Sequence, residues 1–168
     1  VRSRKVGEDL DPLEPAKVAA AAARMGLRHV VVTSVDRDDL PDRGAGHWAQ
    51  TIRALRRRCP EARIEALVPD FLGAEEEALA TVLEAAPDVF NHNIETCRRI
   101  QPIVRPKGGY DAALHLLRRA REVQAERWPE RGPLLTKSGL VVGMGETDDE
   151  VVETMRDLRE HGVDVVTV

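Results

Sequence analysis

The sequence lacks a long apolar run, a secretory leader and a dominant charge of one sign. No stretch approaches the roughly 20 apolar residues that span a bilayer, and the opening VRSRKVGEDLDP has no apolar centre of the kind that a secretory signal needs. With 32% charged residues the net charge is only -4, so the chain has no polybasic field for nucleic acid. We therefore expect a cytoplasmic protein with no membrane and no nucleic-acid partner.

The sequence also has few candidate metal ligands. Its two cysteines, Cys59 and Cys97, form neither a CxxC pair nor a spaced ligand set, and we interpret both as structural. His92 has no second His or Cys nearby in the sequence, which favours a hydrogen-bonded residue over a metal ligand. We predict no metal site in these residues.

Strand and helix patterns alternate along the chain. Apolar and β-branched runs predict strands that begin near residues 29, 63, 88, 134 and 163. Apolar residues at helical spacing predict five helices: Pro15 to Met25, a helix around 48–55 that ends near Pro60, and helices near 75–85, 111–124 and 148–160. The alternation predicts a parallel sheet covered by helices, either an open doubly wound sheet or part of a (βα) barrel.

Polar residues gather where four of the predicted strands end. They are Thr33, Ser34 and Asp36, then Asp70, then Asn91, His92, Asn93 and Glu95, and finally Lys137 and Ser138. In both candidate folds the carboxyl ends of the strands meet at one edge, where ligands bind. We therefore predict a functional site at that edge.

The stretch LLTKSGLVVGMGET, residues 134–147, joins a predicted strand to a helix through a glycine-spaced turn. Three glycines remove Cβ atoms and let the backbone approach a ligand or a neighbouring strand: Gly139, Gly143 and Gly145. Thr147 and Glu150 form a capping-box pattern. Two interpretations stay open, an anion or adenosine pocket and a plain tight turn whose Glu146 favours the helix dipole. A Rossmann fingerprint fits poorly, because no acid-tipped second strand follows.

Three other features have alternative interpretations. Lys137 could form a Schiff base, pair with a carboxylate, or contact a ligand carboxylate. The acids of TSVDRDD around Arg37 are typical of a solvated loop, and Gly108 and Gly109 are typical of a flexible linker before a helix capped by Asp111. One basic cluster is interpreted as a solvated loop, with an anion site as the alternative: Arg98, Arg99, Arg105 and Lys107.

Five strings, in this order and spacing, resemble the lipoyl synthase family of radical S-adenosylmethionine enzymes from about Leu13 onward. They are TSVDRDDL (33–40), ALVPDF (66–71), DVFNHNIET (88–96), VRP (104–106) and TKSGLVVGMGET (136–147). Gly139, Val141, Gly143 and Glu146 fit the G-x-I-x-G-x-x-E pattern, which in the wider radical family lies against the adenine of the cofactor.

The resemblance implies a partial (βα)6 barrel of TIM type over residues 15–168, without its first strand, after a lead-in segment at 1–14. It implies an enzyme in which a 4Fe-4S cluster reduces S-adenosylmethionine and a second cluster donates two sulfur atoms to an octanoyl chain. Its partners would be an octanoylated lipoyl-carrier protein domain and an electron donor. The residues implied to line the cofactor side are Thr33, Ser34, Asn93, Glu95, Arg105, Lys137, Ser138, Gly139, Val141, Gly143 and Glu146.

The sequence departs from the family in its cluster ligands. The CxxxCxxC loop, the second cysteine set and the C-terminal serine of the family have no counterpart here, so we expect a fragment that is inactive alone. Two other hypotheses remain. One is a non-catalytic α/β ligand-binding or interaction domain derived from such a barrel. The other is an aldolase-type barrel that uses Lys137.

Overall fold

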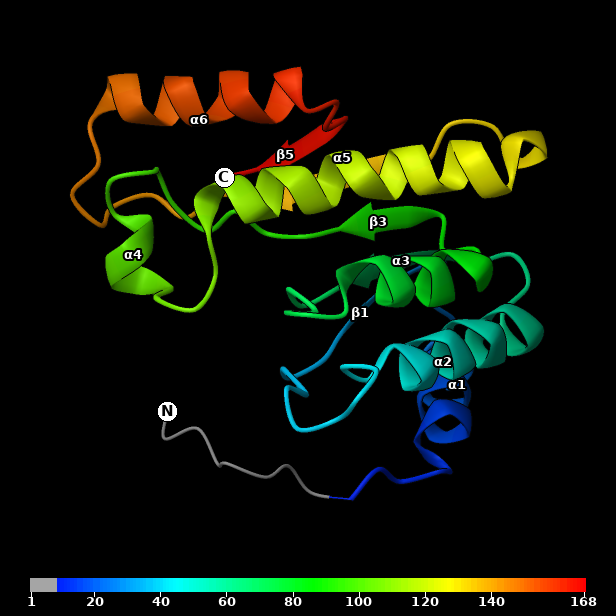
Figure 1. Ribbon diagram of the computed structural model, residues 1–168. Coiled ribbons are helices and arrows are strands. Elements are labelled where there is room, and N and C mark those ends of the chain that lie inside the picture. The colour runs from blue at the N-terminus through cyan, green and yellow to red at the C-terminus, as the bar shows by residue number, and fades with distance from the viewer. Residues whose placement is uncertain (1–8) are drawn as a thin grey trace. The chain divides into compact units, whose positions relative to one another are not determined.

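The computed structural model describes residues 9–168, which divide into two compact units (Figure 1). The first unit ends at Asp88, and the second comprises Val89–Val168. Part of the predicted lead-in segment, residues 1–8, lies outside the described residues. Each unit is described below by itself.

The described residues of the first unit form three helices and two strands. They are α1 (Glu14–Arg24), β1 (His29–Thr33), α2 (Ala45–Arg58), β2 (Arg63–Leu67) and α3 (Glu75–Glu84). The two strands pair in parallel, from His29 beside Arg63 to Thr33 beside Leu67. Gly26, at φ 63°, lies just beyond the end of α1, as its predicted role as a helix stop requires.

The core of the first unit follows from the apolar face of α2. Trp48, Ile52 and Leu55, at the predicted helical spacing, are buried, and α2 packs against both α1 and α3. The strand side chains that complete this core, such as Ile64, are fully buried as well. Together these contacts hold the end of β1, with Thr33 and Ser34, beside the start of α2.

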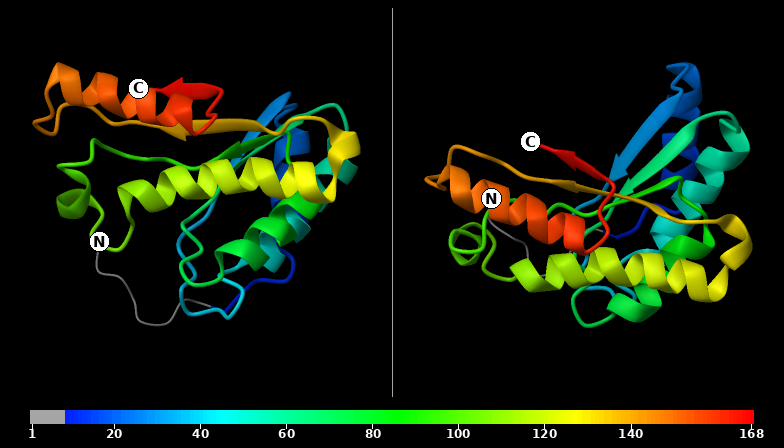
Figure 2. Two further views of the ribbon diagram at one scale, coloured as in Figure 1. Left: turned by 45° about the horizontal axis from the view of Figure 1, so that its top comes forward. Right: turned by 90° about the horizontal axis from the view of Figure 1, so that it is seen from above.

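The second unit has the same alternation of strands and helices. Its elements are β3 (Val89–Asn91), α4 (Gln101–Val104), α5 (Tyr110–Arg127), η1 (Pro129–Arg131), β4 (Leu135–Gly139), α6 (Asp148–Glu160) and β5 (Val165–Thr167). Its strands pair in parallel in the order β3-β4-β5, with Asn91 beside Lys137 and Lys137 beside Val165. Helices α5 and α6 lie side by side along this three-stranded sheet (Figures 1 and 2).

One aspartate joins the start of a strand to a helix in the first unit. The Asp88 carboxylate accepts hydrogen bonds from the backbone N–H of Ile64 at 2.7 Å and from the Arg56 guanidinium at 2.6 Å. The Asp88 N–H in turn donates to the Ile64 carbonyl at 2.8 Å. Asp88 therefore joins the second residue of β2 to helix α2, and its carboxylate provides the acceptor for the backbone N–H of that residue.

The second unit repeats this arrangement with different residues. The Asp164 carboxylate, directly before β5, accepts from the Thr136 backbone N–H at 2.8 Å and from Arg121 of α5 at 2.6 Å. The Asp164 N–H donates to the Thr136 carbonyl at 3.1 Å. Thr136 is again the second residue of its strand and is fully buried. An aspartate after one helix and an arginine from another thus fix the start of a strand in both units.

The order and type of the five strands and five long helices agree with the sequence prediction, with two additions. The short helices α4 and η1 are missing from it, because a segment of three or four residues has no helical periodicity to detect. The expected Asp111 cap is wrong: the N-cap of α5 is Gly109, and Asp111 instead binds Arg98 at 2.7 Å. The capping box of Thr147 and Glu150 is confirmed at the start of α6.

Within residues 9–168, no helix is both long enough and apolar enough to cross a membrane.

Candidate functional site

The carboxyl ends of β3 and β4 are joined by an interrupted pairing. Asn91 lies beside Lys137, and pairing resumes with Glu95 beside Leu140, so the β3 side has one extra residue over this interval. The Glu95 N–H donates to the Gly139 carbonyl at 3.0 Å, and its own carbonyl accepts from Val141 at 2.7 Å. Between the two anchored ends, Asn93 and Glu95 are half-buried, whereas His92 and Ile94 are buried.

Glu95 has a backbone conformation that residues other than glycine rarely adopt. Its φ is 70°, in the left-handed region, which costs on the order of 1 kcal/mol or more for such a residue. Strain of this kind persists only where surrounding contacts enforce it, and it is concentrated at ligand sites. Here the two backbone hydrogen bonds to β4 and its continuation enforce it. Arg43, Phe71 and Ala86 also have positive φ, so this strain supports the predicted site only together with the bulge in which Glu95 lies.

The side chains around this bulge are closely packed. Ser138 is fully buried, and its hydroxyl accepts from the Ile94 N–H at 3.1 Å. A Cβ at Gly139 would lie 2.6 Å from Oδ1 of Asn93 and 2.9 Å from its Cγ. The close approach predicted for this glycine is thus present, and the neighbour that requires it is Asn93. Ser138, Gly139 and Asn93 therefore belong to one closely packed cluster.

Arg105 approaches the same segment from the end of α4. Its guanidinium donates to the carbonyl of Asn93 at 3.1 Å. Gly108 provides the space for this side chain, because a Cβ there would lie 2.9 Å from Nε of Arg105. Gly108 is also half-buried. The interpretation of the 108–109 pair as a plain flexible linker is therefore wrong for Gly108, which packs against an arginine of the predicted site.

The turn after β4 is closed by its own acid. Gly143 and Gly145 both have positive φ, 99° and 96°. The Glu146 carboxylate accepts from the backbone N–H of Gly143 and from that of Met144 at 2.8 Å. These bonds, that of Gly143 first, lower the pKa of Glu146 below its ordinary value. The Gly143 and Met144 amides already bind a carboxylate, which disfavours an external anion at these two amides. The adenosine alternative stays a prediction.

The same turn presents an apolar surface. Val141, Val142 and Met144 are 51%, 48% and 38% exposed, although each is a large apolar side chain. They lie next to the polar bulge formed by Asn93 and Glu95, through the backbone bond from Val141 to the Glu95 carbonyl. An apolar shelf beside hydrogen-bonding groups is suited to an aromatic base attached to a polar group.

The predicted basic cluster does not form one surface, because its arginines bind separate partners. Arg99 donates to both carboxylate oxygens of Glu150 at 2.7 and 2.8 Å and to the Gly145 carbonyl at 2.8 Å. Arg98 binds Asp111, and Arg105 binds the Asn93 carbonyl. The side chains of Arg98 and Arg99 are 52% and 57% exposed, which agrees with the solvated-loop interpretation, although each is paired with acids.

The Arg99 ion pair lowers the pKa of Glu150 to about 2, with the bond from the Thr147 N–H as a further cause. Because the folded pKa lies below the ordinary value of 4.5, the ionised carboxylate favours the folded state. This contribution is complete above about pH 4.5 and is lost as the pH falls toward 2. We expect an NMR titration of Glu150 to give a midpoint far below 4.5, and Arg99→Gln to raise that midpoint. A midpoint near 4.5 in the unaltered chain would contradict this prediction.

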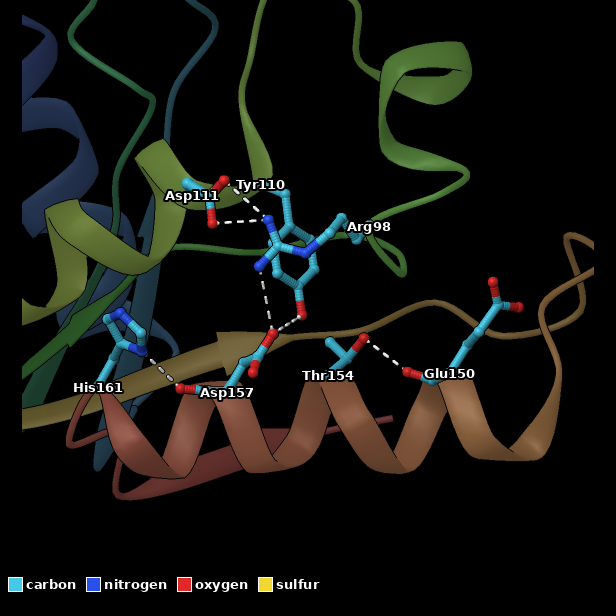
Figure 3. A network of polar contacts seen from close by, with 7 residues as sticks. All are labelled: Arg98, Tyr110, Asp111, Glu150, Thr154, Asp157 and His161. Atoms are coloured by element: carbon cyan, nitrogen blue, oxygen red, sulfur yellow. Dashed lines mark hydrogen bonds and ion pairs between the residues drawn. The ribbon is translucent and has the colours of Figure 1, made fainter.

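A second polar network joins α5 to α6 (Figure 3). The Arg98 guanidinium lies 4.2 Å from the centre of the Tyr110 ring, between Asp111 and Asp157, and the Tyr110 hydroxyl donates to Asp157 at 2.9 Å. Burial, first of all, raises the pKa of Tyr110 well above its usual range. Sequence reasoning missed this network, because its members are far apart along the chain. A cavity of about 230 Å³ adjoins it, with Cys97 and Thr154 among its lining residues.

Thr33 and Ser34, the two predicted site residues of the first unit, line a cavity of about 310 Å³ within that unit. The Ser34 hydroxyl accepts from the Trp48 indole at 3.1 Å. In the TSVDRDD loop, Arg37 pairs with Asp39 at 2.8 Å. The other nine predicted site residues belong to the second unit. The bulge and turn bring most of them together: Asn93, Glu95, Arg105, Ser138, Gly139 and Val141.

Candidate metal ligands are scattered. Across residues 9–168, no three His, Cys, Asp or Glu side chains are grouped so that they could hold a metal ion. Cys59 is partly buried and Cys97 is buried, and both are free thiols. His92 is buried and belongs to no such group.

Residues 2–158 match the radical SAM superfamily, and the chain belongs to that superfamily. Its relatives are similar over nearly its whole length. It is 52% identical over 161 residues to lipoyl synthase of Rubrobacter xylanophilus and 52% identical over 160 residues to those of Pyrobaculum calidifontis and Thermus thermophilus. These matches cover 95–96% of this chain but 47–52% of the relatives, so the chain spans about half their length.

A solved structure supports the fold. Coproporphyrinogen III oxidase from Escherichia coli, a radical SAM enzyme, matches with a TM-score of 0.58 over 90% of this chain and 35% of its own. The sequences are only 17% identical, so this likeness bears on the fold alone. The predicted α/β fold, a partial barrel of the radical SAM type, is confirmed, as is the predicted resemblance to lipoyl synthases. The individual site residues stay predictions.

Proposed function

We propose that this chain is the cofactor-binding part of a lipoyl synthase and that the second unit holds the adenosyl end of S-adenosylmethionine. The observation that carries the proposal is the strained, doubly anchored bulge at Glu95 beside the Gly139 turn. Identity of 52% to lipoyl synthases over nearly the whole chain supplies the reaction. In that reaction two sulfur atoms are inserted into an octanoyl chain on a carrier-protein domain, and an electron donor is required.

The residues of the second unit fit this cofactor. The half-exposed Val141, Val142 and Met144 would pack against adenine, and the bulge side chains Asn93 and Glu95 would hydrogen-bond its polar groups. Lys137 would attract the methionine carboxylate, and Arg105 would hold the Asn93 carbonyl in place. When bound and reduced, S-adenosylmethionine supplies a 5'-deoxyadenosyl radical that abstracts hydrogen from an unactivated carbon. The part of this chain would be to bind, orient and shield that group.

We propose that Thr33 and Ser34 bind the cofactor, as the family resemblance implies. The first unit supports this only in part, since the Ser34 hydroxyl accepts a hydrogen bond from Trp48 and both residues line a cavity. The division into a lead-in at 1–14 and a barrel domain at 15–168 also stays a prediction. A cytoplasmic location likewise stays a proposal.

The described residues do not fit an iron–sulfur cluster. No group of three potential ligands exists among residues 9–168, and the two cysteines of the sequence do not form a ligand set. We therefore expect that this polypeptide alone does not catalyse the reaction. Both 4Fe-4S clusters of the proposed reaction would require cysteines outside these 168 residues.

The proposal is tested with protein expressed from the complete coding region and reconstituted with iron and sulfide. We expect cleavage of S-adenosylmethionine and a mass gain of two sulfurs on an octanoylated carrier domain. The second candidate function is a non-catalytic ligand-binding or interaction domain, which the lack of grouped metal ligands within residues 9–168 favours. A coding region without a CxxxCxxC triad, or a reconstituted protein without cleavage, would decide for that candidate.

The isolated chain offers a further prediction. We expect it to bind S-adenosylmethionine no more tightly than high micromolar, because residues 9–168 contain no ligand group for the iron that normally chelates the methionine group. Isothermal titration calorimetry measures this directly. The buffer without ligand and S-adenosylhomocysteine, which lacks the sulfonium charge, serve as controls. Sub-micromolar affinity in the absence of a cluster would contradict the prediction.

A further inference from the structure

The turn after β4 is held by one short segment, residues 95–99, at both of its ends. At the start of the turn, the Glu95 backbone bonds the Gly139 carbonyl and the Val141 N–H. At the end of the turn, the Arg99 side chain bonds the Gly145 carbonyl at 2.8 Å. The segment therefore spans the turn from its first residue to its last glycine.

Other support for the turn lies at its first residues, where the buried Leu140 donates its N–H to the Thr167 carbonyl at 2.9 Å. A Cβ at Gly143 or Gly145 would meet no described atom within 4 Å, so the glycines pack against nothing on that side. Glu146 binds the turn to itself through Gly143 and Met144, which fixes its shape but not its position. The position of the Gly145 end of the turn relative to the bulge therefore depends on the Arg99 contact.

Arg99 combines two functions in one guanidinium. It forms a bidentate ion pair with Glu150, which is itself held in the capping box with Thr147 at the start of α6. The nitrogen Nη2 also bonds the Gly145 carbonyl. Arginine makes these three bonds from two nitrogens of its planar fork, whereas lysine has its three donors on a single atom and cannot reproduce the bidentate geometry. Arg99 thus ties the turn, the helix start and the bulge segment together.

We propose that Arg99 is a positioning residue that sets the affinity of the turn for the adenosyl group without touching it. This inference rests on the proposed binding of S-adenosylmethionine at the turn. Loss of the guanidinium frees the Gly145 carbonyl and the helix start to move away from residues 95–99. The apolar shelf of Val141 and Met144 then loses its fixed distance from the bulge, and binding weakens while the chemistry of bound cofactor is unchanged.

Arg98 is a matched control. It is adjacent in sequence, its side chain is 52% exposed against 57% for Arg99, and it also binds acids, Asp111 and Asp157. It makes no bond to the turn in the described structure. Replacement of Arg98 therefore removes the same charge and a comparable number of ion pairs, but it leaves the turn tied.

The experiment uses the reconstituted holoprotein from the complete coding region, with Arg99→Gln, Arg99→Lys and Arg98→Gln. For Arg99→Gln we expect the Kd and KM for S-adenosylmethionine to rise about five- to tenfold and kcat to change less than about twofold. Arg99→Lys should give an intermediate loss, and Arg98→Gln a change below about twofold. Hydrogen–deuterium exchange of the 140–147 peptide should become faster in Arg99→Gln alone.

If Arg99→Gln and Arg98→Gln give the same Kd, or if kcat falls without a change in KM, Arg99 does not position the turn. If binding changes but exchange of the 140–147 peptide does not, the inference is likewise wrong. Failure of the proposed function is distinct, because the unaltered holoprotein would then show no protection of this peptide by S-adenosylmethionine. Glu150→Gln should reproduce the direction of the Arg99→Gln effect, with less than additive loss in the double variant.

Discussion

Replacing Gly139 by alanine is expected to destabilise the chain by about 1–3 kcal/mol and to weaken binding of S-adenosylmethionine more than tenfold in the holoprotein. The added Cβ would lie 2.6 Å from Oδ1 and 2.9 Å from Cγ of Asn93, distances that no relaxed contact allows. Either Asn93 leaves the site or β4 shifts, and the Ser138 bond to Ile94 shifts with it. Urea denaturation and calorimetric titration measure the two effects.

Two controls separate the clash from a general cost of losing glycine. Gly109→Ala places a methyl group 3.3 Å from its nearest neighbour, Ala112, and should change stability by less than about 0.5 kcal/mol. Asn93→Ala removes the atoms that Gly139→Ala would meet, so the double variant should be more stable than Gly139→Ala alone. Strict additivity of the two single changes would show that the predicted contact is not the cause.

Replacing Asp164 by alanine is expected to lower the free energy of unfolding by about 2–3 kcal/mol. The carboxylate accepts from the buried Thr136 N–H at 2.8 Å, from the Thr136 hydroxyl at 3.0 Å and from Arg121 at 2.6 Å. Alanine leaves a strand N–H without its acceptor and removes an ion pair. Asp164→Asn keeps an acceptor oxygen and should cost about half as much.

The first unit provides a parallel test of the same arrangement. Asp88→Ala removes the acceptor of the Ile64 N–H and the partner of Arg56, and it should cost about as much as Asp164→Ala. The side chains of the two aspartates are 36% and 35% exposed, so differences in burial do not confuse the comparison. Glu153→Gln, on the exposed surface of α6, is the control and should stay within about 0.5 kcal/mol. An effect of that small size at Asp164 would show that water replaces the carboxylate.

Sequence reasoning predicts the fold because its signals are local. The β-branched runs at 29–33 and 63–67, the spacing of apolar residues in α2, and the capping box of α6 each lie within a few residues. The short α4 and the true cap of α5 have no comparable signal within a few residues. Asp111 is a good capping residue in isolation, but Arg98, thirteen residues away, binds its carboxylate instead.

The site is predictable only in part for the same reason. Glycine spacing locates the turn, and the strand ends locate Asn93 and Ser138, but the bulge depends on the register between β3 and β4. Arg99 has its partners 46 and 51 residues away, so in sequence it is one basic residue among neighbours. No local pattern separates it from Arg98, and only the folded structure shows that the two differ.

The carboxylate of Glu146 also restricts which adenine compounds the turn can accept. Glycine-rich turns that bind nucleotides offer their backbone amides to phosphate oxygens. Here the Gly143 and Met144 amides are already taken by a negative charge within the turn. A triphosphate or a dinucleotide would have to displace that charge and would be repelled by it, whereas a sulfonium nucleoside would be attracted. Under the proposed function, the residue that closes the turn thus disfavours adenine compounds that carry phosphate groups at this position.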